Sequence, residues 1–173
     1  MSHTLTSRRL RLISVAHTDI DRVTVLLHEP DVRRYLCDDT LLPRDHIARI
    51  VAASLDPASG TTYWRIATPT HALAGIIGLQ PPSIAVGRLR PIGWRSRELL
   101  VALDPGLWGT GLATKAIDAV ADHALADGVT FALLGAVDEP NVRSHRLMAR
   151  CAFAELGRVP GPRHTRVVYE RSL

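Results

Sequence analysis

Residues 98–116 read ELLVALDPGLWGTGLATKA, and the rest of the chain can be placed around this stretch. It opens with an apolar run, Glu98–Leu103, typical of a buried strand. Asp104 and Pro105 end that strand, and a glycine-rich turn leads into a helix expected over Thr110–Ala126. Glycines let the backbone approach a ligand, and a helix N-terminus offers unpaired N–H groups with a partial positive charge. The stretch therefore predicts a strand–turn–helix unit whose turn can hold a diphosphate.

Glycine spacing alone leaves a second interpretation of this turn open. G-x-G is a weak signal, and the third glycine of a dinucleotide-binding fingerprint is missing. Lys115 is not preceded by the spacing of a Walker motif. The glycines could therefore serve only the packing of a plain strand-to-helix turn.

Periodicity and breakers predict the other elements on both sides of this unit. Upstream, we expect a strand at Arg9–Val15, a helix capped by Thr18 and ending near Glu29, helices at Asp31–Leu36 and Asp45–Leu55, strands at Thr61–Thr68 and Leu73–Leu79, and an irregular segment at Ser83–Trp94. Downstream, we expect Gly128 to end the helix, followed by a strand at Val129–Val137, a helix at Asn141–Cys151, and strands at Phe153–Val159 and Thr165–Tyr169. This order predicts a single domain, residues 1–173, of the α/β class (an α+β mixed sheet) with helices on both faces.

Composition narrows the class of protein. With 46% hydrophobic and 22% charged residues, the chain is expected to fold as a soluble globular protein. No signal peptide or membrane-length apolar run is present, and Cys37 and Cys151 read as reduced thiols, so we expect a cytoplasmic location. The net charge is +4, but no basic run with interleaved aromatics points to nucleic acid. The histidines have no metal-ligand spacing, so no metal is expected.

Four segments carry a resemblance to a known family. The first is residues 98–116, quoted above; the others are LTSRRLRL at 5–12, EPDVRRYL at 29–36 and NVRSHRLMARCAF at 141–153. In this order they resemble the GNAT-type N-acetyltransferases, most closely the RimJ/RimL branch, over nearly the whole chain. The resemblance implies the GNAT fold, a central, mostly antiparallel sheet flanked by helices, and acetyl-CoA as co-substrate.

The resemblance also implies roles for particular residues. The backbone of Val101 and Leu103 is expected to pair with the pantetheine arm, Asn141 to hydrogen-bond it, and Ser144 to lie near the thioester sulfur. The pyrophosphate is expected on the amides of Leu107, Trp108, Gly109, Thr110, Gly111, Ala113 and Thr114, with Arg146 and Arg150 at the nucleotide end. The chain departs from the family where Met148 replaces a frequent tyrosine acid and Ala152 replaces a glycine.

The chemistry expected from the family is direct attack of an amine on the acetyl thioester. An ammonium must first lose a proton, and Glu98 is the best candidate for the base. Glu98 could instead form an ion pair with Arg95 or Arg97. Ser144 could protonate the departing thiolate or simply be a solvent-facing helix residue. A backbone N–H near Val101 could stabilise the developing oxyanion.

The acceptor is expected to be a primary amine, on either a small molecule or a protein N-terminus. The loop residues Arg88, Arg90 and Trp94 could line its site. Three alternatives stay open: a longer acyl-CoA donor, a non-catalytic acyl-CoA-binding module, and, from the pI alone, nucleic-acid binding. A homodimer is expected from the resemblance only.

Overall fold

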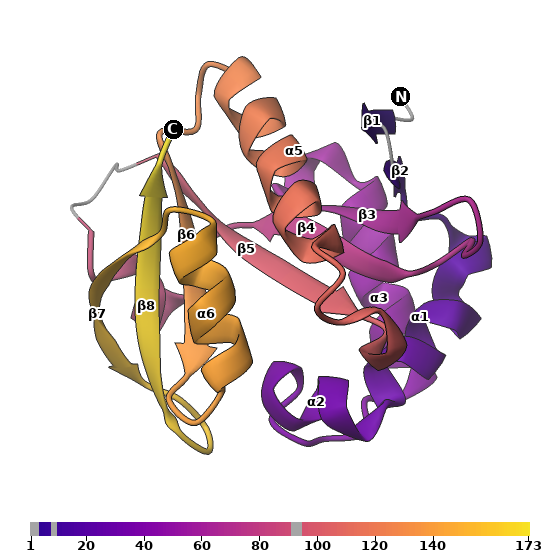
Figure 1. Ribbon diagram of the computed structural model, residues 1–173, viewed down its shortest axis with the longest axis horizontal. Helices are drawn as coiled ribbons and strands as arrows, with labels where there is room; N and C mark the ends of the chain where they lie inside the picture. Colours follow the sequence, from indigo (N-terminus) through magenta and orange to yellow (C-terminus); the bar gives the residue numbers. More distant parts are fainter. Residues whose placement is uncertain (1–3, 8–9, 91–94) are drawn as a thin grey trace.

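A single eight-stranded sheet runs through the computed structural model, which describes residues 4–7, 10–90 and 95–173 (Figure 1). The strand order is β1-β2-β3-β4-β5-β6-β8-β7, and every neighbouring pair is antiparallel except β5 and β6. The strands are β1 (Thr4–Ser7), β2 (Leu10–Ser14), β3 (Thr62–Ala67), β4 (Gly75–Gln80), β5 (Ser96–Leu103), β6 (Ala132–Asp138), β7 (Ala154–Pro160) and β8 (Thr165–Ser172). This is the mixed, mostly antiparallel sheet that the resemblance implies.

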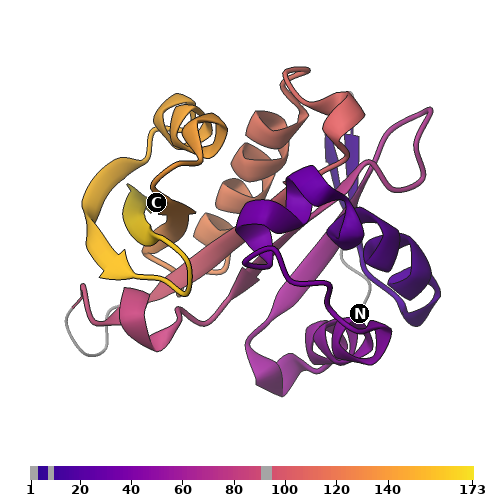
Figure 2. The same ribbon diagram turned by 90° about the horizontal axis from the view of Figure 1, so that it is seen from below.

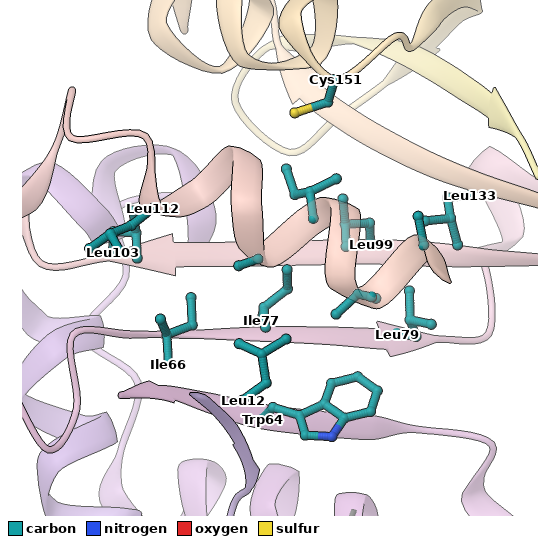
Figure 3. Close-up of a cluster of buried hydrophobic side chains, with 14 of the residues drawn as sticks. Leu12, Trp64, Ile66, Ile77, Leu79, Leu99, Leu103, Leu112, Leu133 and Cys151 are labelled. Atoms are coloured by element: carbon teal, nitrogen blue, oxygen red, sulfur yellow. The ribbon is translucent and has the colours of Figure 1, made fainter. Parts of the chain in front are cut away.

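Helices cover both faces of this sheet (Figures 1 and 2). The helices are α1 (Ile20–His28), α2 (Pro30–Leu36), α3 (Arg44–Leu55), α4 (Ile84–Gly87), α5 (Leu112–Ala126) and α6 (Val142–Arg150), and the 3-10 turns are η1 (His17–Asp19), η2 (Pro57–Ser59) and η3 (Pro105–Leu107). The largest apolar cluster joins strands β2–β6 to α5 and α6 (Figure 3). Two smaller clusters join the opposite face to α1, α2 and α3.

Side chains of β5 alternate between these two layers, as the period of a strand requires. Leu99 and Leu103 pack in the cluster under α5, whereas Leu100 and Ala102 pack against the α1–α3 layer. Glu98 has the same parity as Leu100, so its side chain lies on the α1–α3 face. The two faces of β5 therefore contact different helices: α5 on one side, and the α1–α3 layer on the other.

Most predicted elements are confirmed, with local differences that have physical causes. The predicted Thr18 cap is wrong: Thr18 lies in η1, and Asp19 is the N-cap of α1 and accepts a hydrogen bond from the Ala16 amide at 3.0 Å. The predicted opening strand is preceded by β1, which pairs with β2. The segment at 83–94 contains the short helix α4, held by the buried Val86.

Two element starts also differ from the predicted positions. Helix α5 begins at Leu112 rather than at Thr110, because Gly111 takes the left-handed conformation, with φ of +80°. Strand β6 begins at Ala132 rather than at Val129, because Asp127 Oδ1 accepts the amides of Val129 and Thr130 and turns the chain there. Gly128, at φ +65°, follows the end of α5 as predicted.

Among the described residues, no helix is both long and apolar enough to span a bilayer.

Candidate functional site

The sheet splits between β5 and β6. These parallel strands pair only from Ser96 to Glu98, opposite Ala132–Leu134. Beyond that point β5 stays paired with β4 as far as Leu103, and β6 stays paired with β8, so the two strands diverge (Figure 1). One backbone edge of residues 99–103 therefore faces the gap instead of another strand.

The register identifies which groups of β5 face this gap. The amide of Asp104 donates to Ala74 of the β4 side at 2.9 Å. Because hydrogen bonding alternates along an antiparallel pair, Ala102 also bonds toward β4, while Val101 and Leu103 direct their N–H and C=O groups toward the gap. The Leu103 carbonyl is partly used, since it accepts from the indole N–H of Trp108 at 3.0 Å. The N–H and C=O of Val101 stay available to an extended ligand.

The glycine turn after β5 forms a cradle of backbone amides. The amides of Leu107 and Trp108 are engaged inside the turn, donating to the carbonyls of Asp104 and Pro105. Among the described residues, no acceptor meets the amides that follow. These are the amides of Gly109, Thr110, Gly111, Leu112, Ala113 and Thr114. Six adjacent N–H groups at the start of a 15-residue helix are chemically suited to hold an anion.

The two glycines of the cradle keep its surface open. Gly109 and Gly111 have φ of +79° and +80°, a conformation that a side chain disfavours. A Cβ atom at either position would meet nothing within 4 Å, so the space beside both glycines is open. The described residues therefore fit a diphosphate, since none of them caps the N-terminus of α5 with a side chain.

Helix α6 lies against this turn from the β6 side. The Arg143 guanidinium lies over the Trp108 ring, 4.5 Å from its centroid, and adds a positive charge beside the cradle. At the other end of α6, burial raises the pKa of the Cys151 thiol, and the side chain of Thr114 of α5 acts in the opposite direction. Arg146 and Arg150 lie one helical turn apart on α6, and both are exposed. Sequence reasoning missed Arg143, because only the fold brings it to the turn.

Asn141 and Ser144 lie at the N-terminus of α6. Asn141 caps the helix, and its Oδ1 accepts the Ser144 amide at 3.2 Å, which leaves the side-chain NH₂ for another partner. The half-buried Ser144 is followed by His145, whose ring nitrogens contact the Tyr169 hydroxyl (2.7 Å) and the Glu139 carbonyl (3.0 Å). His145 thus belongs to a different face of α6 from Ser144.

The structure explains both departures at the end of α6. Met148 is buried and packs against Gly135, where an added Cβ would lie 3.0 Å from the Met148 sulfur. Because this side chain is a thioether, it supplies no hydroxyl at the position of the frequent tyrosine. Ala152 has φ of +59°. Its amide donates to Ala149, and the Phe153 amide donates to Met148, which is the Schellman arrangement where glycine is favoured.

Glu98 lies on the opposite face of β5 from α5, half-buried, and accepts the Ser83 amide at 2.8 Å. The alternative predicted for it, an ion pair with Arg95 or Arg97, is not what those arginines form. Arg97 donates to the backbone carbonyls of Gly60 and Leu79, and Arg95 lies over the Phe131 ring. The Glu98 carboxylate is thus fixed by a neutral backbone donor.

A polar row continues from Glu98 across the sheet. Gln80 is the cross-strand partner of Glu98, and its Oε1 accepts from the Tyr63 hydroxyl at 2.5 Å. Burial raises the pKa of Tyr63 to about 12, and the nearby charge of Glu98 adds to the increase. The Tyr63 ring crosses Gly78, where an added Cβ would lie 2.0 Å from Cδ1, so the row depends on that glycine.

This row borders a cavity of about 440 Å³ on the α1–α3 face. Six of its eleven lining residues are aliphatic: Leu27, Leu36, Leu42, Ile50, Ile76 and Leu100. The polar lining is Tyr63, Gln80, Thr40, Cys37 and Asp38. Leu100, another lining residue, belongs to β5, the strand that borders the split. Sequence reasoning missed the cavity, because its lining comes from six separate elements and loops.

Ion pairs connect one wall of the cavity to the β7–β8 hairpin. Asp38 and Asp39 both have positive φ. Arg166 bonds both Asp38 (2.7 Å) and the buried Asp138 (2.8 Å), and Arg163 lies 3.4 Å from Asp39. Arg166 therefore connects Asp38, in the cavity wall, to Asp138, at the end of β6 on the other side of the split.

Two other predictions concern residues near the site. Trp94 lies outside the described residues, and Arg90 is committed to an ion pair with Glu170. In the part of the chain that the structure describes, no three His, Cys, Asp or Glu side chains come together as a metal site.

Known structures share this fold. An acetyltransferase that modifies the N-terminal serine of ribosomal protein L7/L12, from Salmonella typhimurium, superposes with a TM-score of 0.80 at 16% identity, over 99% of each chain. Spermidine N-acetyltransferase from Vibrio cholerae, with coenzyme A and spermine, gives 0.76 at 16% identity over 96% of each chain. Aminoglycoside acetyltransferase AAC(6')-Ib with coenzyme A gives 0.74 at 16% identity, over 95% of this chain and 94% of that one.

At these identities the structural likeness establishes the fold, and family membership rests on the sequence. No curated protein sequence matches the chain significantly. The family model described as an acetyltransferase (GNAT) domain matches residues 9–154, which include the split, the glycine cradle, Glu98 and Ser144. The chain belongs to the GNAT acetyltransferases, a family that uses acetyl-CoA as its donor.

Proposed function

We propose that this protein transfers the acetyl group of acetyl-CoA to a primary amine by direct attack in a ternary complex. The observation that carries the proposal is the two-sided split: six unpartnered amides on the α5 side of β5, and a cavity beside a carboxylate on the other side. A donor and an acceptor can therefore meet at β5 without competing for the same groups. The structural relatives named above act on protein N-termini, a polyamine and aminoglycosides, all of them amines.

The donor would be held mainly by backbone. The amides of Gly109, Thr110 and Gly111, with those of Ala113 and Thr114, would bind the pyrophosphate, while Leu107 and Trp108 shape the turn. Val101 offers its strand edge to the pantetheine, with the Leu103 carbonyl shared with Trp108 and the Asn141 amide group opposite. Arg146 and Arg150 stand on the exposed face of α6 for the nucleotide end. Bound acetyl-CoA supplies an activated acyl carbon on a good leaving group.

Glu98 would take the proton that the acceptor ammonium must lose. The neutral amine nitrogen then forms the N–C bond, the C–S bond breaks and the sulfur leaves as a thiolate, and the second proton that the nitrogen must lose neutralises that thiolate. Ser144 would hydrogen-bond the thiolate or protonate it, since Met148 offers no hydroxyl. The amide of Val101 would stabilise the charge that develops on the carbonyl oxygen.

The direct test is amine-dependent release of the CoA thiol, with the N-acetyl product identified by mass spectrometry. Initial rates with both substrates varied are expected to give intersecting lines. Parallel lines would contradict direct attack, because they indicate a covalent acetyl-enzyme. Release of CoA that does not depend on any amine would contradict transfer to an amine.

Three further proposals concern assembly and location: one acetyltransferase domain over residues 1–173, a homodimer, and a cytoplasmic location; only the homodimer rests on the resemblance alone. Three exposed apolar side chains near the end of α5, Leu125, Val129 and Phe131, offer a surface for self-association. Light scattering on a sizing column measures the mass, and a mass of 18.9 kDa would contradict the dimer.

A further inference from the structure

The cavity beside Glu98 has a chemical character that limits its acceptor. Its six aliphatic residues come from α1, α2, α3, β4, β5 and the loop before α3, so they surround the space instead of forming one patch. Its volume, about 440 Å³, lies toward the small end of the range for small-molecule sites, about 300–1,000 Å³. The body of a ligand in this space would contact hydrocarbon on several sides.

Carboxylates near the cavity are few and mostly neutralised. Asp38 is the acidic member of the lining. In the wall that ties the cavity to the hairpin, three aspartates face three arginines: Asp38 and Asp138 share Arg166, and Asp39 lies between Arg33 and Arg163. The wall is therefore electrically balanced and has no surplus negative charge for a cationic ligand.

One carboxylate stands apart from this balance. Glu98 is held by the backbone amide of Ser83, which carries no net charge, and it lies close enough to Tyr63 to raise the pKa of that phenol. Tyr63 and Gln80 of the polar row line the cavity, and Glu98 lies next to Gln80 on the neighbouring strand, at the start of the split. The site thus offers a counter-ion for one ammonium group, at the end where the thioester would lie.

We infer that the acceptor is a primary monoamine on an aliphatic or otherwise apolar body, and not a polyamine, an aminoglycoside or another polycation. The inference rests on the proposed acetyl transfer and names the substrate class of the same site. A second ammonium in this cavity would lose its water against leucine and isoleucine side chains with no carboxylate to receive it, which is strongly unfavourable. The apolar body gains from the same walls.

A matched pair of amines tests the inference: n-hexylamine and 1,6-diaminohexane, which have equal length and differ by one ammonium. At saturating acetyl-CoA, the wild type is expected to acetylate hexylamine with kcat/KM at least about tenfold higher, although the diamine has two reactive ends. From butylamine to hexylamine, kcat/KM should increase roughly fourfold for each methylene group. Calorimetry with CoA present should give the same order of binding, independent of turnover.

A variant pair locates the effect in the cavity. Ile50→Glu places a carboxylate in the apolar wall, and it should lower the hexylamine-to-diamine ratio at least about tenfold by supplying the missing counter-ion. Val25→Glu adds the same charge on α1 at a residue that is 66% exposed, and the ratio should not change. If Ile50→Glu does not fold, as judged by circular dichroism, the wild-type ratio still decides the question.

Three results overturn the inference: equal or better use of the diamine by the wild type, preference for spermidine, or acetylation of peptide N-termini with neither alkylamine accepted. Each of these leaves the proposed acetyl transfer intact, because CoA is still released. If the wild type does not bind acetyl-CoA and releases no CoA with any amine, the proposed function fails, and the inference fails with it.

Discussion

The two faces of β5 are built from different materials. Along the gap and the turn that leads into α5, the proposed donor site consists mostly of main-chain groups from one continuous stretch, residues 101–114. On the α1–α3 face, the proposed acceptor site consists of side chains from α1, α2, α3, three strands and a loop. A backbone site survives sequence change as long as its turn keeps its shape, whereas a side-chain site can be rebuilt residue by residue. The comparison explains how one fold can keep its donor while its acceptors vary.

The sharpest way to separate the two faces is Glu98→Gln. Removing the base should lower kcat by about 10²–10⁴-fold, while the affinity for acetyl-CoA stays within about twofold of wild type. Steady-state kinetics and calorimetry measure the two quantities. Glu155→Gln, which changes an exposed carboxylate on β7, is the matched control. Equal losses in binding and turnover would show that the faces are not independent.

Burial of Tyr63 should make the free energy of unfolding depend on pH in the alkaline range. The pKa of Tyr63 is raised to about 12 in the folded protein, above about 10 when unfolded. The neutral phenol is favoured by folding, so this stability is fully present below pH 10 and is lost as pH rises through 12. Two pKa units correspond to about 2–3 kcal/mol. Urea unfolding should show a steeper loss between pH 10 and 12 for wild type than for Tyr63→Phe, and parallel curves would refute the assignment.

Gly78→Ala tests whether the position of the Tyr63 ring depends on the absence of a side chain at residue 78. Its Cβ would lie 2.0 Å from Tyr63 Cδ1, so the ring must move, and overpacking of this kind costs about 1–3 kcal/mol. The same ring carries the hydroxyl that bonds Gln80, so the KM for the amine should rise while acetyl-CoA affinity is kept. In a double-mutant cycle, Tyr63→Leu should remove the part of this cost that comes from the ring, while the contact with the Thr62 carbonyl oxygen, 2.7 Å from the new Cβ, remains. Additive losses would mean that the ring is not what the new methyl group meets.

A smaller effect is expected on the donor side, at the end of α6. Ala152 holds φ of +59°, which glycine adopts more easily, so Ala152→Gly should stabilise the protein by about 0.5–1 kcal/mol. Ala149→Gly, inside α6, should destabilise it by a similar amount. Thermal unfolding measures both changes. A loss of stability in both variants would contradict the Schellman assignment.

The sequence predicts the donor face far better than the acceptor face, for a physical reason. Residues 98–126 form strand, turn and helix in one continuous segment, so local periodicity and glycine placement were enough to predict the cradle. They could not reveal that the amides of Leu107 and Trp108 are used inside the turn, since that depends on the path of η3. Nor could they reveal Arg143 over Trp108, the arginine–aspartate wall or the cavity, because those contacts join residues distant in sequence.

The central claim is that backbone amides beside Gly109 and Gly111 hold the donor, and calorimetric titration with acetyl-CoA tests it most directly. The wild type should bind with micromolar affinity, and Gly109→Trp with Gly111→Trp should weaken binding by about 100-fold or more, because two indoles would fill the open space beside the glycines of the turn. Gly128→Trp, with φ of +65° and equally open surroundings at the far end of α5, carries the same backbone strain and should bind as wild type does. Undiminished binding by the double variant, or no binding by the wild type, would contradict the account.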